Sequence, residues 1–185
     1  MIAAEEIFTI FDRRGLDAYF GEPVSMTEHA LQAAHFAKLG DAPPSLVLAA
    51  LLHDIGHLIE DVPQDLADWK TDARHEMAGS RWLAKRFGPR VAEPVRLHVP
   101  AKRYLCATEP AYLSRLSSAS MVTLRLQGGP MCASEVAQFE QEPFGEDAVR
   151  LRRWDDQGKI AGFVTTALEE YRHLIEALAG SRDPD

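Results

Sequence analysis

The sequence has little sulfur chemistry and no long apolar run. Only two cysteines, Cys106 and Cys132, occur among 185 residues, and neither lies in a CxxC or other ligand spacing. A disulfide framework and a thiolate zinc site therefore have little support, and two ordinary thiols are the simpler interpretation. No apolar stretch approaches the roughly 20 residues that a membrane-spanning helix needs. The N-terminal residues also lack the pattern of a secretory signal, so we expect a cytoplasmic protein.

The sequence also lacks a basic cluster. Its formal net charge is -8, and its lysines and arginines are spread along the chain. This distribution argues against a nucleic acid or a membrane as partner. We expect a small-molecule substrate, and an anionic one would have to be held by a few local cations and metals. The sequence does not indicate an oligomeric state.

What the sequence does contain is a series of helical patterns. A chain of 185 residues is about the size of one domain, so we assign residues 1–185 to a single domain. Ser25-Met26-Thr27-Glu28 fits a capping box at the start of a helix that ends at Gly40. Further helices are predicted at 46–59, 72–87, 90–98, 109–126, 134–141, 146–156 and 165–179. No hairpin-like alternation is convincing, and the predicted fold class is all-α.

The segment LLHDIGHLIE carries the strongest chemical signal. His53, Asp54 and His57 interrupt a helix that is otherwise apolar on nearly every side. An unpaired buried carboxylate costs several kcal/mol, so a partner is needed, and a metal cation would also explain the imidazoles. One such histidine would favour a hydrogen-bonded core residue, but three ionisable groups within five residues favour a metal site.

Other candidate ligands follow, about one on each predicted helix. They are His29, His75, His98 and a carboxylate at Asp155 or Asp156. Imidazole and carboxylate ligands suit iron, manganese or zinc, and the residue types alone do not choose among these metals. His35 and His173 are interpreted as surface or packing residues.

The order of these residues resembles the HD-domain superfamily, whose fold is a helical bundle with a mononuclear or binuclear metal site. Most members are phosphohydrolases, but this chain looks like the phosphonate-degrading branch of diiron oxygenases, the PhnZ and TmpB type. The resemblance runs from Tyr19 to Asp155. It implies a single-domain HD helical bundle, with the metal site built from residues 19–155 and a C-terminal helix at 165–179.

The resemblance implies two iron ions in a mixed-valent Fe(II)/Fe(III) state, with O2 as co-substrate. One iron would be bound by His29, His53, Asp54 and Asp155, and the other by Asp54, His75 and His98. Asp54 would then bridge the two ions. The choice of Asp155 over Asp156 rests on the resemblance alone.

The resemblance also implies a gate and a substrate site. Tyr19 would occupy the open position of the second iron, and Glu22 in the same loop would move with it when substrate arrives. The residues matching the phosphonate-contacting positions are His57, Lys102, Ser120 and Arg152. Lysine and arginine supply charge-assisted hydrogen bonds to phosphonate oxygens.

The activity implied is O2-dependent cleavage of the C–P bond of a 1-hydroxy-2-(trimethylammonio or amino)ethylphosphonate, giving phosphate and glycine betaine or glycine. A primary ammonium group wants carboxylate and carbonyl acceptors, whereas a trimethylammonium group favours aromatic faces with a nearby anion. Tyr19, Glu22, Trp69 and Tyr104 could contribute to binding either group, and we slightly prefer the trimethylated substrate.

The main alternative is a metal-dependent HD phosphohydrolase acting on a nucleotide or small phosphate ester, and a non-catalytic binding module is a weaker one. Gly128-Gly129 could form an anion-binding nest, although a helix-ending turn explains the two glycines as well.

Overall fold

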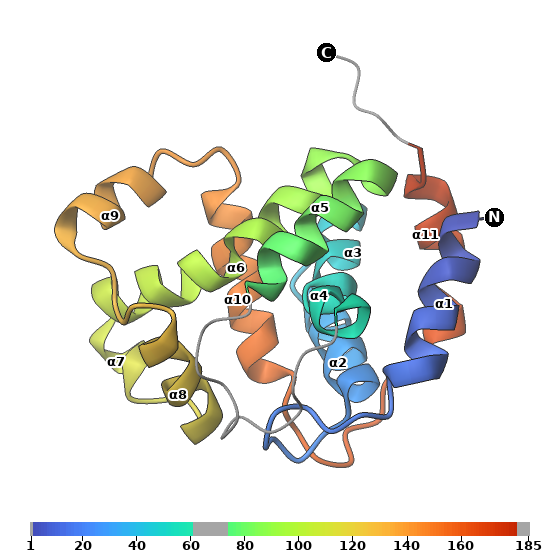
Figure 1. The fold of residues 1–185 in the computed structure, drawn as a ribbon, viewed down its shortest axis with the longest axis horizontal. Helices are drawn as coiled ribbons and strands as arrows, with labels where there is room; N and C mark the ends of the chain where they lie inside the picture. The colour runs from blue at the N-terminus through green and yellow to red at the C-terminus, as the bar shows by residue number, and fades with distance from the viewer. Residues whose placement is uncertain (1, 61–73, 181–185) are drawn as a thin grey trace.

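The structure, a computed structural model, describes residues 2–60 and 74–180, and the regular structure of these residues is helical (Figure 1). A single antiparallel bridge, between Ala18 and Ser25, lies outside the helices in this part of the chain. The helices are α1 (Ile2–Arg14), α2 (Met26–Leu39), α3 (Pro44–Leu52), α4 (Ile55–Ile59), α5 (His75–Phe87), α6 (Pro89–Thr108), α7 (Pro110–Leu113), α8 (Ser118–Leu126), α9 (Ala133–Phe139), α10 (Gly145–Gln157), the 3-10 turn η2 (Leu168–Tyr171) and α11 (Arg172–Leu178). The expected all-α class is confirmed, while a single domain over residues 1–185 stays a prediction.

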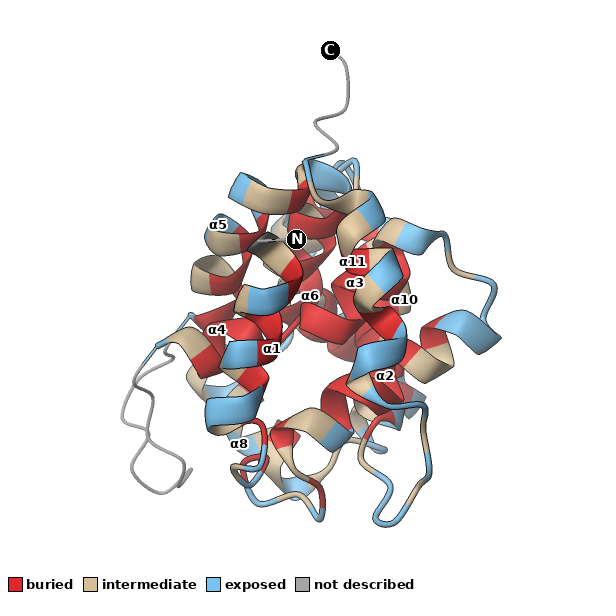
Figure 2. Cartoon of the chain, turned by 90° about the vertical axis from the view of Figure 1, so that its right-hand side faces the viewer, coloured by how far each residue is buried: buried red, intermediate tan, exposed pale blue. Residues whose placement is uncertain are grey.

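The centre of the bundle is formed by α3, α6 and α10. The long helix α6 packs against α3, α5 and α10, and α2 lies against α3 and α10. Every residue of α3 from Leu46 to Leu52 is buried, as its continuous apolar sequence predicted. Buried residues line the inward sides of the helices around this centre (Figure 2). None of the described helices is long and apolar enough to cross a membrane.

The predicted helix 46–59 is interrupted at the His53-Asp54 dyad, so the prediction of one continuous helix is wrong. His53 keeps helical angles, but Asp54 has φ -100° and ψ 13°, and α4 begins at Ile55. Gly56 then approaches α5 so closely that a Cβ there would lie 2.0 Å from the His75 carbonyl oxygen. The change of direction at Asp54 therefore fits α4 against α5, which no local pattern reveals.

The predicted helix 90–98 is too short. α6 has 20 residues and continues through Pro94 and Pro100, although proline removes a backbone donor and crowds the preceding turn. This helix packs against α3, α5 and α10, and Pro94 is buried among these contacts. Tertiary packing thus outweighs the local cost of the two prolines.

Three other boundaries differ from the prediction. The predicted helix 109–126 is divided into α7 and α8, because Ser117 caps a new helix and accepts a hydrogen bond from the Ser120 amide. The predicted helix 165–179 is replaced by η2 and the short α11. Helix α1, which was not expected, packs against α11. Residues 72–73 of the predicted helix 72–87 lie outside the described residues.

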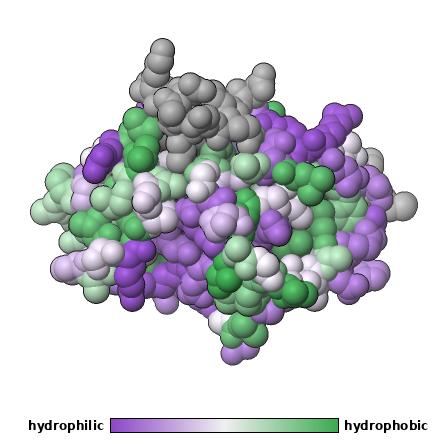
Figure 3. Space-filling view, turned by 90° about the horizontal axis from the view of Figure 1, so that it is seen from below, coloured by the Kyte–Doolittle hydropathy of each residue, from purple (hydrophilic) through white to green (hydrophobic). Residues whose placement is uncertain are grey.

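One end of the bundle carries the segment 15–25 and α8, at the bottom of Figure 1. The capping box predicted at the start of α2 is present, with Ser25 and Glu28 each accepting a hydrogen bond from the other's amide. Seen from below, this end has hydrophilic groups near its middle and hydrophobic groups around them (Figure 3). The candidate site lies between this end and the central helices.

Candidate metal centre and anion pocket

Two pairs of buried histidines face each other in the middle of the bundle. The Nε2 atoms of His29 and His53 are 3.0 Å apart, and those of His75 and His98 are 3.2 Å apart. The four rings come from α2, the end of α3, α5 and α6, so the fold gathers residues that are far apart in sequence. All four side chains are almost completely buried.

Asp54 lies between the two pairs and contacts both. Its Oδ2 atom is 3.6 Å from His29 Nε2 and 3.4 Å from His53 Nε2. Its Oδ1 atom is 3.2 Å from His75 Nε2 and 3.5 Å from His98 Nε2. Each carboxylate oxygen thus completes one three-residue group that could hold a metal ion, and the same carboxylate could bridge two ions.

The first pair fits a metal ion because of how its other ring nitrogens are used. Nδ1 of His29 lies 2.9 Å from the Gly158 carbonyl oxygen, and Nδ1 of His53 lies 2.9 Å from the Ala50 carbonyl oxygen. Since a carbonyl only accepts, each Nδ1 carries the proton, and the Nε2 atoms are the natural ligands. Without a cation between them, one ring must also be protonated at Nε2.

The pKa values of the two rings indicate that the extra proton is on His53 and not on His29. Burial and the neighbouring His53 lower the pKa of His29 to about 4. Burial also lowers the pKa of His53, but the Asp54 carboxylate outweighs it and raises the value to about 9. A metal ion bound here would take the place of that proton, and ion binding should release it.

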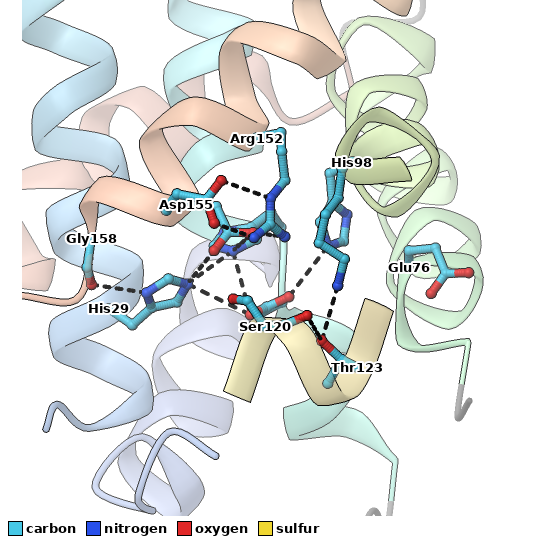
Figure 4. A network of polar contacts seen from close by, with 12 residues as sticks. His29, Glu76, His98, Ser120, Thr123, Arg152, Asp155 and Gly158 are labelled. Carbon is cyan, nitrogen blue, oxygen red and sulfur yellow. Dashed lines mark hydrogen bonds and ion pairs between the residues drawn. The ribbon is translucent and has the colours of Figure 1, made fainter. Parts of the chain in front are cut away.

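Asp155 faces the same histidines from α10. Its Oδ1 atom is 3.5 Å from His29 Nε2, and its Oδ2 atom is 3.8 Å from His53 Nε2 and 2.7 Å from Arg152 Nη1. Burial raises the pKa of Asp155, but Arg152 and other cations outweigh it and hold that pKa well below its usual range. Asp156 instead accepts from Tyr112 and Arg152, so of the two carboxylates Asp155 is the one directed at the histidines (Figure 4).

The loop that begins at Tyr19 covers the centre. The Tyr19 hydroxyl donates a hydrogen bond of 2.8 Å to Asp54 Oδ2, and the Tyr19 ring stacks on the His29 ring at 3.8 Å. Burial, followed by the Asp54 carboxylate, raises the pKa of Tyr19 well above its ordinary value. Glu22, in the same loop, accepts a hydrogen bond from Ser117 at the start of α8. The loop is therefore held at both the histidine cluster and α8.

A small cavity of about 50 Å³ lies beside Asp54, under this loop. It is lined by the four residues expected to contact substrate, namely His57, Lys102, Ser120 and Arg152. Lys102 Nζ donates to Thr123 Oγ1 at 2.9 Å, and burial followed by Arg152 lowers the pKa of Lys102 to about 7. The His57 ring stacks on the His75 ring at 3.8 Å. The cavity thus combines buried cations with the edge of the histidine cluster.

Three further residues of this region were not predicted. Lys159 lines the cavity, and its ammonium group lies 3.0 Å from Ser120 Oγ. Glu76 is buried, with Oε2 at 3.7 Å from His75 Nδ1. Gln127 lines the cavity, and its buried Oε1 has no hydrogen-bond partner among the described residues. Lys159 lies beyond the end of α10, so helical spacing from Asp155 could not have pointed to it.

Several other expectations can be compared with the structure. Tyr104 lies outside the cavity, where its ring stacks on Phe139 and its hydroxyl group donates to Glu140, so the structure does not support its contribution to binding a substrate ammonium group. The packing is set by α9, which covers that side of α6. Trp69 lies outside the described residues. His35 contacts aromatic rings away from the cavity, and His173 is exposed, as expected of packing and surface residues.

The two glycines after α8 and the two cysteines behave as ordinary structural residues. The amides of Gly128 and Gly129 donate to the carbonyls of Arg125 and Leu124 at the end of α8. They form a helix-ending turn, and the alternative of an anion-binding nest is not supported. Both cysteines are free thiols.

Comparison with known proteins places these residues in a family context. The family model described as HD domain matches residues 26–127. A hydroxymethylphosphonate dioxygenase from Gimesia maris is 45% identical over 172 residues, covering 92% of this chain and 85% of that protein. A glycine-betaine-forming 1-hydroxy-2-(trimethylamino)ethylphosphonate dioxygenase from Leisingera caerulea is 44% identical over 174 residues, covering 94% of this chain and 89% of that protein. An uncharacterized protein of Acanthamoeba polyphaga mimivirus is 35% identical over 179 residues.

Proposed function

Because this chain belongs to the HD-domain family, in the branch of the phosphonate dioxygenases, we propose that it is a diiron oxygenase that cleaves the C–P bond of a 1-hydroxyalkylphosphonate. The observation that carries the proposal is the Asp54 carboxylate shared between two histidine pairs beside a cavity lined by buried cations. The cytoplasmic location expected from the sequence is part of the same proposal.

The donor set supports a pair of iron ions. We assign His29, His53, Asp54 and Asp155 to one ion and Asp54, His75 and His98 to the other. All of these ligands are nitrogen or oxygen atoms, which suit iron and disfavour a thiolate zinc site. When bound, a mixed-valent iron pair would supply the activation of O2 and the electron transfers that protein side chains do not provide.

The remaining residues would bind and orient the substrate. Lys102 and Arg152 would neutralise the phosphonate, with hydrogen bonds from Ser120 and His57. The carbon that carries the hydroxyl group would then lie toward Asp54 and the histidine cluster. The Tyr19 hydroxyl donates a hydrogen bond to Asp54 in the site without substrate, so Tyr19 would have to withdraw when substrate binds. Glu22 in the same loop would move with it.

The overall reaction balances without another reductant. For hydroxymethylphosphonic acid and O2, the products are formic acid and phosphoric acid, and the four electrons that O2 accepts come from the C–H and C–P bonds. For the substrates with a trimethylammonio or amino group, the carboxylic acid would be glycine betaine or glycine.

The described residues give less support to a substrate that carries an ammonium group than the sequence did. Tyr104 lies elsewhere, and the Glu22 carboxylate already has Ser117 and Lys159 as partners. The cavity of about 50 Å³ is also far below the ~300 Å³ common for small-ligand pockets, so a large substituent requires the loop to move. The proposal therefore includes hydroxymethylphosphonate beside the two amino-bearing substrates.

A phosphohydrolase, the alternative from the same fold, is not favoured. Both named relatives that exceed 40% identity are dioxygenases. A hydrolase acting on a phosphate ester would also have no evident need for a tyrosine hydroxyl placed over the shared carboxylate.

The test is phosphate release by iron-loaded protein, with and without O2. The compounds are hydroxymethylphosphonate, 1-hydroxy-2-(trimethylammonio)ethylphosphonate and 1-hydroxy-2-aminoethylphosphonate. We expect release that strictly requires O2 and consumes one O2 per phosphate. Hydrolysis of a phosphate ester without O2, together with no release from any phosphonate, would move the assignment to the phosphohydrolases.

A further inference from the structure

Lys159 connects the loop over the metal centre to the cavity and to α10. Its ammonium group is 3.0 Å from Ser120 Oγ and 3.8 Å from each of three carboxylate oxygens, on Glu22, Asp155 and Asp156. Glu22 belongs to the loop, Asp155 faces the histidines, and Ser120 lines the cavity. A single cation therefore contacts all three parts of the site.

The backbone on both sides of Lys159 is fixed to α2. The Gly158 carbonyl accepts from His29, and a Cβ at Gly158 would lie only 3.2 Å from the Ala33 amide nitrogen. Gln32 is buried and exchanges two 3.0 Å hydrogen bonds with the backbone of Ile160. Because residues 158 and 160 are both held, the Lys159 side chain is directed into the cavity and has little freedom to turn away.

The carboxylate contacts of Lys159 can be exchanged for a stronger partner. At 3.8 Å they are ion pairs without a hydrogen bond, whereas a phosphonate dianion in the cavity could accept one directly. Lys102 and Arg152 line the same cavity, so an anion that they hold lies within reach of the Lys159 ammonium group. A bound phosphonate would thus compete with Glu22 for this cation.

The loop itself is poised to leave once Glu22 loses that partner. Phe20 has φ 40°, a left-handed conformation that is costly for a bulky residue, and Gly21 follows with φ 80°. Besides Lys159, the Glu22 carboxylate has the Ser117 hydroxyl as a described partner. Loss of the Lys159 ion pair would leave the Glu22 carboxylate with the Ser117 hydroxyl group, and so would weaken the hold on the Glu22 end of the loop.

We propose that Lys159 is a positioning residue that couples phosphonate binding to release of the Tyr19–Glu22 loop. In the resting protein its ammonium group holds Glu22 and keeps Tyr19 over Asp54. When a phosphonate enters, the ammonium group turns to the anion, Glu22 is released, and Tyr19 withdraws from Asp54. The inference rests on the proposed function for the identity of the anion, but the resting role of Lys159 does not depend on it.

The test compares Lys159→Met and Lys159→Arg with the parent protein, and Lys85→Met serves as a control because Lys85 is exposed on α5. Hydrogen exchange is measured on iron-loaded protein without O2, with and without hydroxymethylphosphonate. The amides of Tyr19 and Glu22, which donate to Val24 and Tyr19 carbonyls, report loop opening. Steady-state kinetics on the same variants separate KM from kcat.

In the parent protein and in Lys85→Met, we expect slow loop exchange that hydroxymethylphosphonate accelerates. In Lys159→Met the loop should exchange fast without any ligand and respond little to phosphonate, while KM rises roughly 10–100-fold, the range for a lost charge-assisted hydrogen bond. Lys159→Arg should restore most of the coupling, which a merely structural role would not predict.

Slow loop exchange in unliganded Lys159→Met, equal to that of the parent protein, would overturn the proposal, as would a normal phosphonate response in that variant. The proposed function fails separately, if the parent protein releases no phosphate from any phosphonate in the presence of O2. Hydrogen exchange of the loop without ligand does not require activity on a phosphonate. It therefore tests the role of Lys159 even if the proposed function fails, and the two failures can be distinguished.

Discussion

The histidine cluster and the anion pocket are built by different kinds of interaction. In the cluster, three of the four histidines donate a hydrogen bond from Nδ1 to a backbone carbonyl, namely His29 to Gly158, His53 to Ala50 and His98 to Val95. In the pocket, the contacts are ion pairs between side chains, such as Lys159 with Glu22. A backbone carbonyl on a buried helix cannot leave, whereas a side chain can exchange partners. The cluster is therefore suited to hold ions in one geometry, and the pocket is suited to change when an anion arrives.

The largest effect should come from removing the residue that both histidine pairs share. Asp54→Asn keeps the shape but loses the charge and one ligand oxygen, so we expect both ions to bind poorly and phosphate release to fall by roughly a thousand-fold. Metal content per chain and O2-dependent phosphate release measure this. The exposed Asp12→Asn is the matched control. Full content of both ions in Asp54→Asn would contradict a bridging role.

The next largest effect tests the pocket through its pH dependence. Burial and Arg152 lower the pKa of Lys102 to about 7, so its cationic form is present below pH 7 and is lost as the pH rises through that value. We expect kcat/KM for a phosphonate to fall above about pH 7. At pH 6, kcat/KM of Lys102→Met should be roughly 10–100-fold below that of the parent protein. At pH 9, where Lys102 of the parent protein is mostly neutral, the two kcat/KM values should be closer together. A constant ratio of the two rates across this range would exclude titration of Lys102 as the cause.

A smaller effect, on metal affinity, is expected from changing Glu76, the carboxylate beside His75. Glu76 lies 3.7 Å from His75 Nδ1 and is buried, so Glu76→Gln removes a charge that orients and polarises this ring. Changes of this kind cost about 10–100-fold in metal affinity, and we expect the lower end because the contact is long. Competition with a chelator measures the affinity, and the exposed Glu146→Gln is the control. An unchanged affinity would leave His75 oriented by packing alone.

The smallest effect on metal content is expected at Tyr19, which belongs to the movable region. Tyr19→Phe removes the hydrogen bond to Asp54 Oδ2 but keeps the ring that stacks on His29. Iron content should stay within the error of the parent protein, while the resting mixed-valent state should oxidise faster in air. Electron paramagnetic resonance of both proteins over time in air makes the comparison. Equal lifetimes would argue against a gating role for the hydroxyl group.

Features set by the local sequence could be predicted, whereas features set by packing between distant segments could not. The helices and the clustering of His53, Asp54 and His57 follow from apolar periodicity and from the cost of burying charge, which are local signals. The interruption at Asp54 could not be predicted, because it depends on the close approach of Gly56 to α5. The continuation of α6 through Pro94 and Pro100 likewise depends on neighbouring helices.

Within the candidate site, the sequence predicted the residues with distinctive chemistry. It did not predict the roles that depend on where a side chain lies in the fold. From the sequence alone, Lys159 looks like a solvated surface cation. The hydrogen bonds of Gly158 and Ile160 to α2, which direct its side chain into the cavity, are visible only in the structure. Tyr104 has suitable chemistry but lies on the side of α6 covered by α9. Long-range packing decides both cases, and a single sequence carries no direct record of it.

The end of α10 has a consequence for how this protein can vary between lineages. Residues 152–159 supply an anion contact, a carboxylate facing the histidines, a carbonyl that holds His29 and the cation over the cavity. One residue inserted or deleted between Arg152 and Gln157, the last residue of α10, would turn the helical residues after it by about 100° around the helix axis and displace Gly158 and Lys159. Point substitutions can be tested one at a time by natural selection, but a change of length here would remove several functions in one step. Insertions and recombination breakpoints should therefore be absent from this stretch and tolerated after Ile160, beyond the hydrogen bonds that hold residues 158 and 160 to α2.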